Sequence, residues 1–209
     1  MPNVEIILAQ FAILVLSLSF HEAAHAWTAD RLGDPTARLL GRLTLNPLAH
    51  VDWIGTVLFP LVAMFSGFPL IGWAKPVPVS MRSLRDPRRD FAIVALAGPV
   101  SNLILAGAGA VIFRLISAQA ADTSGPVALL AYTAEFVVVI NVLLAVFNMI
   151  PVPPLDGGNV LMGLVSERVA HAIGWLRPYG FMILYLLMFS GLLMQITAPV
   201  RNVLLGWLL

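Results

Sequence analysis

An apolar stretch at about residues 5–28 contains the sequence His21-Glu22-Ala23-Ala24-His25 near its end. The stretch is long enough to cross the roughly 30 Å hydrocarbon core of a membrane as a helix. Ionisable side chains are expensive at that depth and are kept there mainly for function. On a helix, positions i and i+4 share a face, so both imidazoles can reach one metal ion, with Glu22 close enough to act on water there. The stretch therefore predicts a membrane helix that carries a metal site.

The composition agrees with a membrane protein and limits the kind of metal ligand. Of the 209 residues, 59% are hydrophobic and 11% are charged, which is too apolar for a soluble domain of this size. The net charge of +1 gives no indication of a nucleic-acid partner. The chain has no cysteine, so a metal must be held by His, Asp or Glu. The first residues lack the basic region of a signal peptide, and we expect a retained span.

Further apolar stretches predict an all-α polytopic membrane protein. Clear spans are expected at 91–118 and 127–149, and a last long span at 179–198. A shorter helix is expected at 159–175, and short β-like runs at 37–45 predict one or two strands.

The whole chain is expected to form one membrane-embedded domain, 1–209. Its core would cover 5–165, and a C-terminal helical region would cover 176–209.

Residues 53–70 are apolar but contain Pro60, Gly67 and Pro69, and they predict a re-entrant segment. If this segment dips into the membrane and returns, ten of the twelve Lys and Arg residues share one side. By the positive-inside rule that side is cytoplasmic. We therefore expect about four full spans in the cell inner membrane, with the metal site toward the cytoplasm.

A catalytic zinc normally takes three protein ligands and a water, so the two histidines need a partner. Asp156 is the preferred candidate because it lies between Pro-rich chain and Gly157-Gly158, just before a helical run. Glycine there lets the backbone approach a site closely, and a helix start keeps a carboxylate ionised. The alternatives are His50 and Asp52, and less favourably Asp30 and Asp34, which fit better as interfacial polar residues.

Three motifs of the chain resemble the site-2 protease family of intramembrane zinc metalloproteases (peptidase family M50). They are HEAAH in the first span, Ala97-Gly98-Pro99 with Asn102 in the next, and Asn148-Met-Ile-Pro151-Val-Pro153-Pro-Leu155-Asp156-Gly157. The resemblance covers about residues 5–165. Residues 33–56 and 72–79 are similar to the small bacterial branch, which is expected to lack PDZ and cystathionine-β-synthase domains.

The resemblance implies a zinc endopeptidase with one Zn²⁺ per chain that hydrolyses peptide bonds in or near membrane-spanning segments of its substrates. His21, His25 and Asp156 would be the zinc ligands. Glu22 would be the general base toward water and would then protonate the leaving amine. Asn148 would hydrogen-bond the substrate or the developing oxyanion, unless it makes an interhelical hydrogen bond instead.

Extended chain near the site is a candidate edge for pairing with an unwound substrate. The stretches 37–45 and 73–79 are the candidates, and a plain connecting loop is the alternative reading of both. Asn102 and Asn141 are expected to make structural contacts, and Gly98-Pro99 to allow close helix packing or a kink.

Two other functions fit the same central motif. A metal transporter would need ionisable residues in several spans, but the later spans carry almost none apart from Glu135. A protein that binds membrane substrates without cleaving them would not need Glu22. The expected partners are membrane protein or peptide substrates and the lipid bilayer. The basic residues from Arg82 to Arg89 are expected to meet anionic headgroups.

Overall fold

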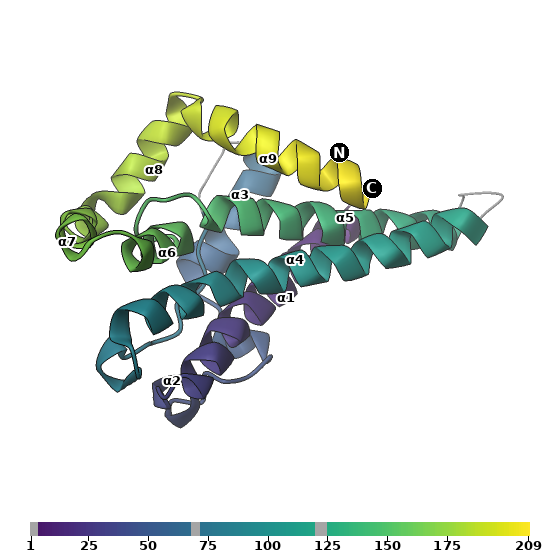
Figure 1. Cartoon of the computed structure of the whole chain (residues 1–209). Coiled ribbons are helices and arrows are strands. Elements are labelled where there is room, and N and C mark those ends of the chain that lie inside the picture. Colours follow the sequence, from purple (N-terminus) through teal and green to yellow (C-terminus); the bar gives the residue numbers. More distant parts are fainter. Residues whose placement is uncertain (1–3, 68–71, 120–124) are drawn as a thin grey trace.

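The computed structural model describes residues 4–67, 72–119 and 125–209 (Figure 1). No β-strand occurs among these residues, which agrees with the predicted all-α polytopic class. The helices in chain order are α1 (Val4–Arg31), α2 (Thr36–Leu39), η1 (Pro47–Ala49), η2 (Trp53–Leu58), α3 (Phe59–Ser66), η3 (Met81–Ser83), α4 (Pro87–Gln119), α5 (Gly125–Asn148), α6 (Asp156–Leu164), α7 (Glu167–Gly174), η4 (Arg177–Tyr179), α8 (Gly180–Phe189) and α9 (Leu192–Leu208).

Four stretches of the described chain are long and apolar enough to cross a membrane, by length and composition. The spans expected at 5–28, 91–118 and 127–149 correspond to α1, α4 and α5. The fourth stretch, Glu167–Phe189, combines α7, η4 and α8. The chain is thus a multi-pass membrane protein.

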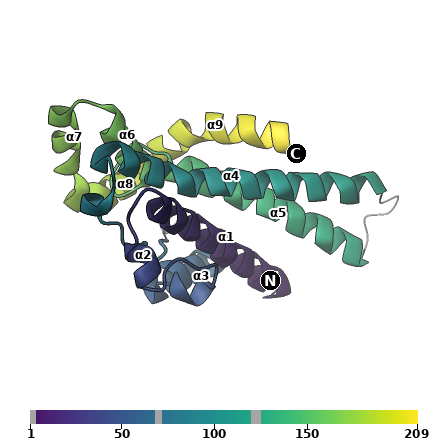
Figure 2. The same ribbon diagram turned by 60° about the horizontal axis from the view of Figure 1, so that its bottom comes forward.

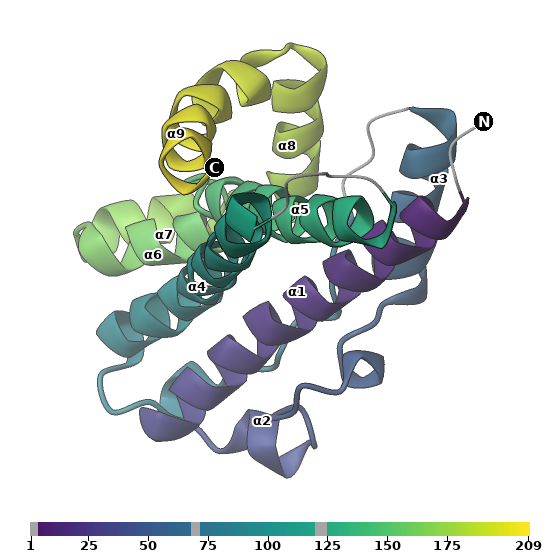
Figure 3. The same ribbon diagram turned by 90° about the vertical axis from the view of Figure 1, so that its right-hand side faces the viewer.

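The expected last span, 179–198, is wrong in its extent because the chain bends after α8. Gly191 adopts a left-handed backbone conformation, with φ of 77°, between α8 and α9. This conformation commonly ends a helix and costs glycine little. Figure 3 shows the resulting bend from α8 into α9. The expected helix at 159–175 is likewise two helices, since extended backbone at Val165 and Ser166 separates α6 from α7.

Helix α4 is the central element of the bundle and packs against α1, α5 and α6 (Figure 2). Ala106 and Ala110 of α4 are buried against Val138 and Val142 of α5, and leucines near the end of α9 pack on this cluster. Small side chains let helix backbones approach closely in membrane proteins. The packing gives α1 a well-defined neighbour along the half that carries the histidines.

The segment that contains η2 and α3 starts and ends at the same place in the molecule. The Trp73 N–H donates to the Gly55 carbonyl across 3.1 Å, and Thr56 Oγ1 donates to the Trp73 carbonyl across 2.8 Å. The chain that leaves with η2 therefore returns beside it. This arrangement fits the predicted re-entrant segment at 53–70, of which residues 68–70 lie outside the described residues.

The strands expected at 37–45 do not form, because the chain turns into the short helix α2. Asp34 Oδ1 accepts hydrogen bonds from the Thr36 N–H (3.1 Å) and from its hydroxyl (2.5 Å), which supports the first helical turn. Residues 73–79 form neither a helix nor a strand. The N–H groups of Trp73 and Lys75 instead donate to the carbonyls of Gly55 and His50.

Candidate metal centre

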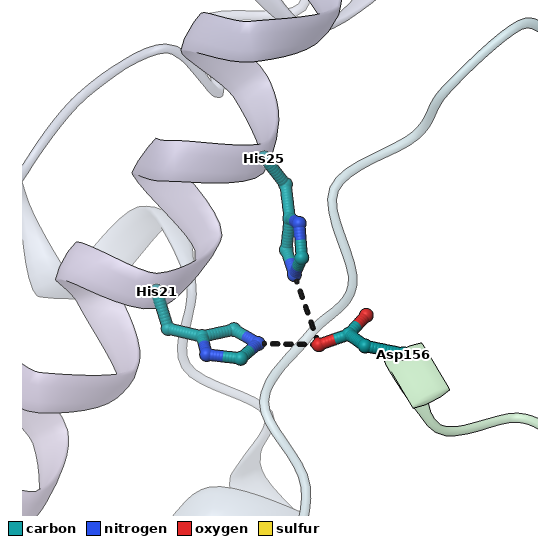
Figure 4. Close-up of side chains that lie close together, drawn as sticks. All are labelled: His21, His25 and Asp156. Atoms are coloured by element: carbon teal, nitrogen blue, oxygen red, sulfur yellow. Dashed lines mark ion pairs between the residues drawn. The ribbon is translucent and has the colours of Figure 1, made fainter. Parts of the chain in front are cut away.

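His21 and His25 lie one turn apart on α1 and are both buried. Their rings are 4.6 Å apart between centroids and almost perpendicular, at 85°. Both Nε2 atoms point to Asp156 Oδ2, at 3.0 Å from His21 and 3.4 Å from His25 (Figure 4). The candidate ligand atoms of the three residues all lie within 4.8 Å of one another. The structure therefore brings together the three residues that the sequence singled out for a metal.

Asp156 reaches this position as the first residue of α6, after a turn rich in proline. A side chain on Gly157 would collide with the carbonyl group of Met149, so glycine allows the close approach of the two segments. Burial on its own would raise the pKa of Asp156, but His25 and His21 beside it lower the pKa well below its usual range. The lowered pKa favours the ionised carboxylate, which is the form that binds a metal.

The outer nitrogens of the two imidazoles are both held by α4. His25 Nδ1 lies 2.7 Å from the carbonyl oxygen of Val94, and His21 Nδ1 lies 2.6 Å from Asn102 Oδ1. Metal-binding histidines commonly use the second ring nitrogen in this way, which fixes the orientation of the ring.

These contacts test whether the residues suit a zinc ion. The Oδ2 atom of Asp156 is buried without a hydrogen-bond partner among the described residues, and it faces the two Nε2 atoms. Two imidazoles and a carboxylate form a donor set that zinc commonly takes, and a fourth position stays available for water or substrate. The residues present fit the metal.

Gly98 of α4 lies directly against the two imidazoles. A side-chain carbon at this position would be 2.5 Å from the Nε2 atoms of both His21 and His25. Gly98 also lies midway between Val94 and Asn102, four residues from each, so the three positions share one face of α4. The role expected for Gly98, close helix packing, is therefore fulfilled at the metal centre itself.

Glu22 is buried beside the three candidate ligands, and its Oε2 accepts a hydrogen bond of 2.8 Å from the Val77 N–H. Val77 belongs to the segment 73–79, which lies along a cavity of about 690 Å³. The same cavity is lined by Glu22, Asn148 and the candidate ligands. The general-base candidate thus faces a space large enough for a segment of extended peptide.

Asn148 lies at the end of α5 and lines this cavity, while its Nδ2 donates to the Leu144 carbonyl across 2.9 Å. Asn102 and Asn141 are fully buried between the helices and hydrogen-bond to each other across 2.8 Å. The structural contacts expected for these two residues are present, and Asn102 also contacts His21.

The four alternative ligand candidates make contacts elsewhere in the molecule. His50 Nε2 is 2.8 Å from the Thr44 carbonyl, and Asp52 accepts from the N–H groups of Ile54 and Gly55 at the start of η2. Asp30 pairs with Arg38 at 3.1 Å, and Asp34 caps the turn described above. None of the four belongs to the metal-ligand cluster found among the described residues, His21, His25 and Asp156.

Two contacts at the site have little or no signal in the sequence. The Val77 N–H reaches Glu22 across 55 positions of chain, and no local pattern indicates this. The contact of Asn102 with His21 has a partial signal, since Asn102 lies one helical turn after Gly98 and thus on the same face.

Helical membrane spans around a HExxH helix define a class of protein, the membrane-embedded metallopeptidases. Comparisons with known proteins agree. Residues 115–189 match the sequence profile of peptidase family M50. "Putative zinc metalloprotease YwhC" of Bacillus subtilis is 39% identical over 194 residues, which cover 90% of this chain and 84% of the relative. "Putative zinc metalloprotease Rip2" of Mycolicibacterium smegmatis is 31% identical over 84% of this chain and 64% of its own length. "Protease RseP" of Photorhabdus luminescens is 29% identical over 78% of this chain and 81% of its own length. No solved structure matches the chain.

The chain belongs to peptidase family M50, the site-2 protease family. It is an intramembrane zinc metalloprotease, and the predictions of a zinc cofactor and of a hydrolase are confirmed.

Proposed function

We propose that the chain hydrolyses peptide bonds in or near membrane-spanning segments of other proteins, in the cavity that contains Glu22. The observation that carries this proposal is the position of Glu22, which shares one 690 Å³ cavity with His21, His25 and Asp156. A transport or storage site would need the ligands but not a carboxylate placed beside them.

His21, His25 and Asp156 would hold the zinc in this proposal. Zinc, when bound, supplies a Lewis acid that lowers the pKa of water and polarises a scissile carbonyl group. Glu22 takes the proton of the attacking water and passes it to the leaving amine. The Val77 N–H holds one carboxylate oxygen of Glu22, so the other oxygen is left for the proton.

Asn148 is proposed to contact the substrate. Its side-chain nitrogen uses one hydrogen for the Leu144 carbonyl, and an amide nitrogen carries two. The second hydrogen can be donated to a substrate carbonyl or to the charge that develops on it.

The surroundings of the cavity support a membrane-spanning substrate. A second cavity of about 620 Å³ adjoins it, and the two share lining residues that include Leu18, Trp73 and Phe147. The lining of the second cavity is mainly apolar, with leucines of α1 and α5 and methionines of α8 and α9, and it also includes Thr197 and Arg201 of α9. An apolar substrate segment can therefore approach the cavity that contains Glu22 through mainly apolar surroundings.

The site is proposed to lie toward the cytoplasmic face of the inner membrane. His25 lies near the C-terminal end of α1, and Asp156 at the start of α6, next to the loops that carry most of the Arg residues. Arg88, in the first turn of α4, donates from Nε to the Met162 carbonyl across 2.9 Å, so this basic stretch lies beside α6. The positive-inside rule makes this end cytoplasmic.

The purified chain in lipid vesicles, with a membrane-spanning model peptide, tests the proposal. Wild-type protein is expected to cleave the peptide. Glu22→Gln is expected to lower the rate by at least about 100-fold while zinc stays bound, because the general base is lost and the ligands remain. Zn²⁺ flux through the vesicles without any cleavage would contradict the proposal and favour a transporter.

A further inference from the structure

The two imidazoles of the metal centre differ in what holds their outer nitrogens. His25 Nδ1 faces the Val94 carbonyl, which can only accept a hydrogen bond. This contact alone requires a hydrogen on Nδ1 of His25, so that Nε2 of the neutral ring offers its lone pair. His21 Nδ1 faces the side chain of Asn102, whose amide has an accepting end and a donating end. The tautomer of His21 therefore depends on the orientation of Asn102.

A buried chain of amides fixes the orientation of Asn102. Asn141 Nδ2 lies 2.9 Å from the Val137 carbonyl, and since a carbonyl only accepts, the nitrogen end of Asn141 must face it. The oxygen end of Asn141 then faces Asn102 and accepts from Asn102 Nδ2 across 2.8 Å. The oxygen end of Asn102 is left for His21, so His21 Nδ1 must donate to it across 2.6 Å.

The chain of hydrogen bonds returns to the helix on which it starts. Asn141 Nδ2 also donates to Ser17 Oγ across 2.9 Å, and Ser17 lies one turn before His21 on α1. The four residues come from α1, α4 and α5, and Asn102 and Asn141 have no exposed surface. Because water does not reach these amides, neither can turn over without leaving buried donors and acceptors unpaired.

We propose that Asn102 and Asn141 are positioning residues that hold His21 in the tautomer whose Nε2 lone pair faces the zinc. Asn102 acts on His21 directly, and Asn141 acts by fixing the amide of Asn102. The inference rests on the proposed role of His21 as a ligand. It adds that the backbone carbonyl of Val94 does for His25 what the two asparagines do for His21.

Zinc affinity of the purified full-length chain, measured by competition with a chelator, tests the proposal. Asn102→Leu removes the acceptor and is expected to weaken zinc binding about 10- to 100-fold. Asn102→Asp keeps an oxygen that accepts from His21 Nδ1 but loses the donor to Asn141 Oδ1, so it is expected to weaken zinc binding clearly less than Asn102→Leu. Asn141→Leu is expected to weaken binding less than Asn102→Leu. Equal losses in Asn102→Leu and Asn102→Asp, or unchanged affinity in Asn102→Leu or Asn141→Leu, would overturn the proposal.

Two controls separate this role from general packing and from the metal site itself. Ser101 lies one position before Asn102, and its partly buried hydroxyl donates to the Gly98 carbonyl. Ser101→Ala removes this hydroxyl and should leave zinc affinity unchanged. His21→Ala should abolish tight zinc binding. If zinc binding survives in His21→Ala, the proposed metal site is wrong. If zinc binding is lost in His21→Ala but unchanged in Asn102→Leu, only the positioning role of the two asparagines is wrong.

A spectroscopic measurement tests the proposal first on the wild-type chain and then on the two Asn102 variants. In the zinc-loaded protein, the proton on His21 Nδ1 is expected to give an NMR signal protected from exchange with water, because the proton is buried in the hydrogen bond to Asn102. The signal should persist in Asn102→Asp and disappear in Asn102→Leu. Its absence from the wild-type protein would overturn the proposal.

Discussion

Val77 donates its backbone N–H to Glu22 Oε2 across 2.8 Å, whereas its two neighbours, Pro76 and Pro78, have no N–H to donate. Within the triplet Pro76-Val77-Pro78 this is the one backbone donor. Proline also keeps the chain extended, which suits a segment that passes over the site. The general-base candidate is thus positioned by a segment that is remote in sequence and stiff by composition.

Val77→Pro is expected to slow peptide cleavage by about 10-fold or more, because a hydrogen bond to a charged group contributes roughly 1.5–3 kcal/mol. Zinc content should not change, since none of the ligands is touched. The matched control is Val77→Ala, which keeps the N–H and removes only side-chain carbons. Rates measured for both variants in vesicles check the prediction, and equal rates would show that the N–H has no role.

Gly98→Ala is expected to weaken zinc binding by at least about 10-fold, since its new carbon would lie 2.5 Å from both Nε2 atoms and must displace the rings. Gly107→Ala is a matched control on the same helix, because a side-chain carbon there meets nothing within 4 Å. Alanine favours a helix over glycine, so the control should be at least as stable as wild type. Zinc affinity equal in the two variants would contradict the close approach of α4 to the site.

Asp34→Ala is expected to lower the free energy of unfolding by about 1–3 kcal/mol, because it leaves buried donors without an acceptor. Asp34 Oδ2 accepts from the Ser80 N–H across 2.6 Å and so ties the end of α1 to the segment that carries Val77. The rate of peptide cleavage should also fall in Asp34→Ala, while zinc stays bound. Thr36→Val, which replaces the hydroxyl that donates to Asp34 with a methyl group, is expected to have the smaller effect in chemical denaturation. The reverse order would count against the link to Ser80.

The topology can be tested by cysteine labelling, since the chain has no cysteine of its own. Single cysteines in place of Arg38 and Arg85 lie before and after the re-entrant segment, and both should react only with a reagent applied from the cytoplasm. A cysteine in place of Ala118, at the far end of α4, should react only from the opposite side. Labelling of Arg38→Cys and Arg85→Cys from opposite sides would mean that the segment crosses the membrane.

The sequence could predict the parts of the site that depend on local spacing. The i, i+4 spacing of His21 and His25 predicts a shared face, and the proline-to-glycine turn around Asp156 predicts a ligand at a helix start. The contacts of Val77 with Glu22 and of Asn102 with His21 depend on how distant segments pack, which spacing along one helix does not encode. Such contacts can be identified only from the three-dimensional structure.

The errors in the predicted fold have local causes. Apolar composition alone extends the last span through 179–198, but the left-handed turn at Gly191 divides it. Among the residues that the structure describes, the β-like stretch 37–45 has no strand with which to pair, and the carboxylate of Asp34 favours a helical turn there. In both places a polar or glycine residue decides the backbone against the pattern of its apolar neighbours.

We expect His21, His25 and Asp156 of one chain to hold the zinc next to Glu22. The most direct measurement is the zinc content of the purified wild-type chain compared with Asp156→Ala and His50→Ala, each checked for intact fold. About one zinc per chain is expected in the wild type and in His50→Ala, and little in Asp156→Ala. Full zinc content in Asp156→Ala, with loss of zinc in His50→Ala, would contradict the assignment of Asp156 as the third ligand.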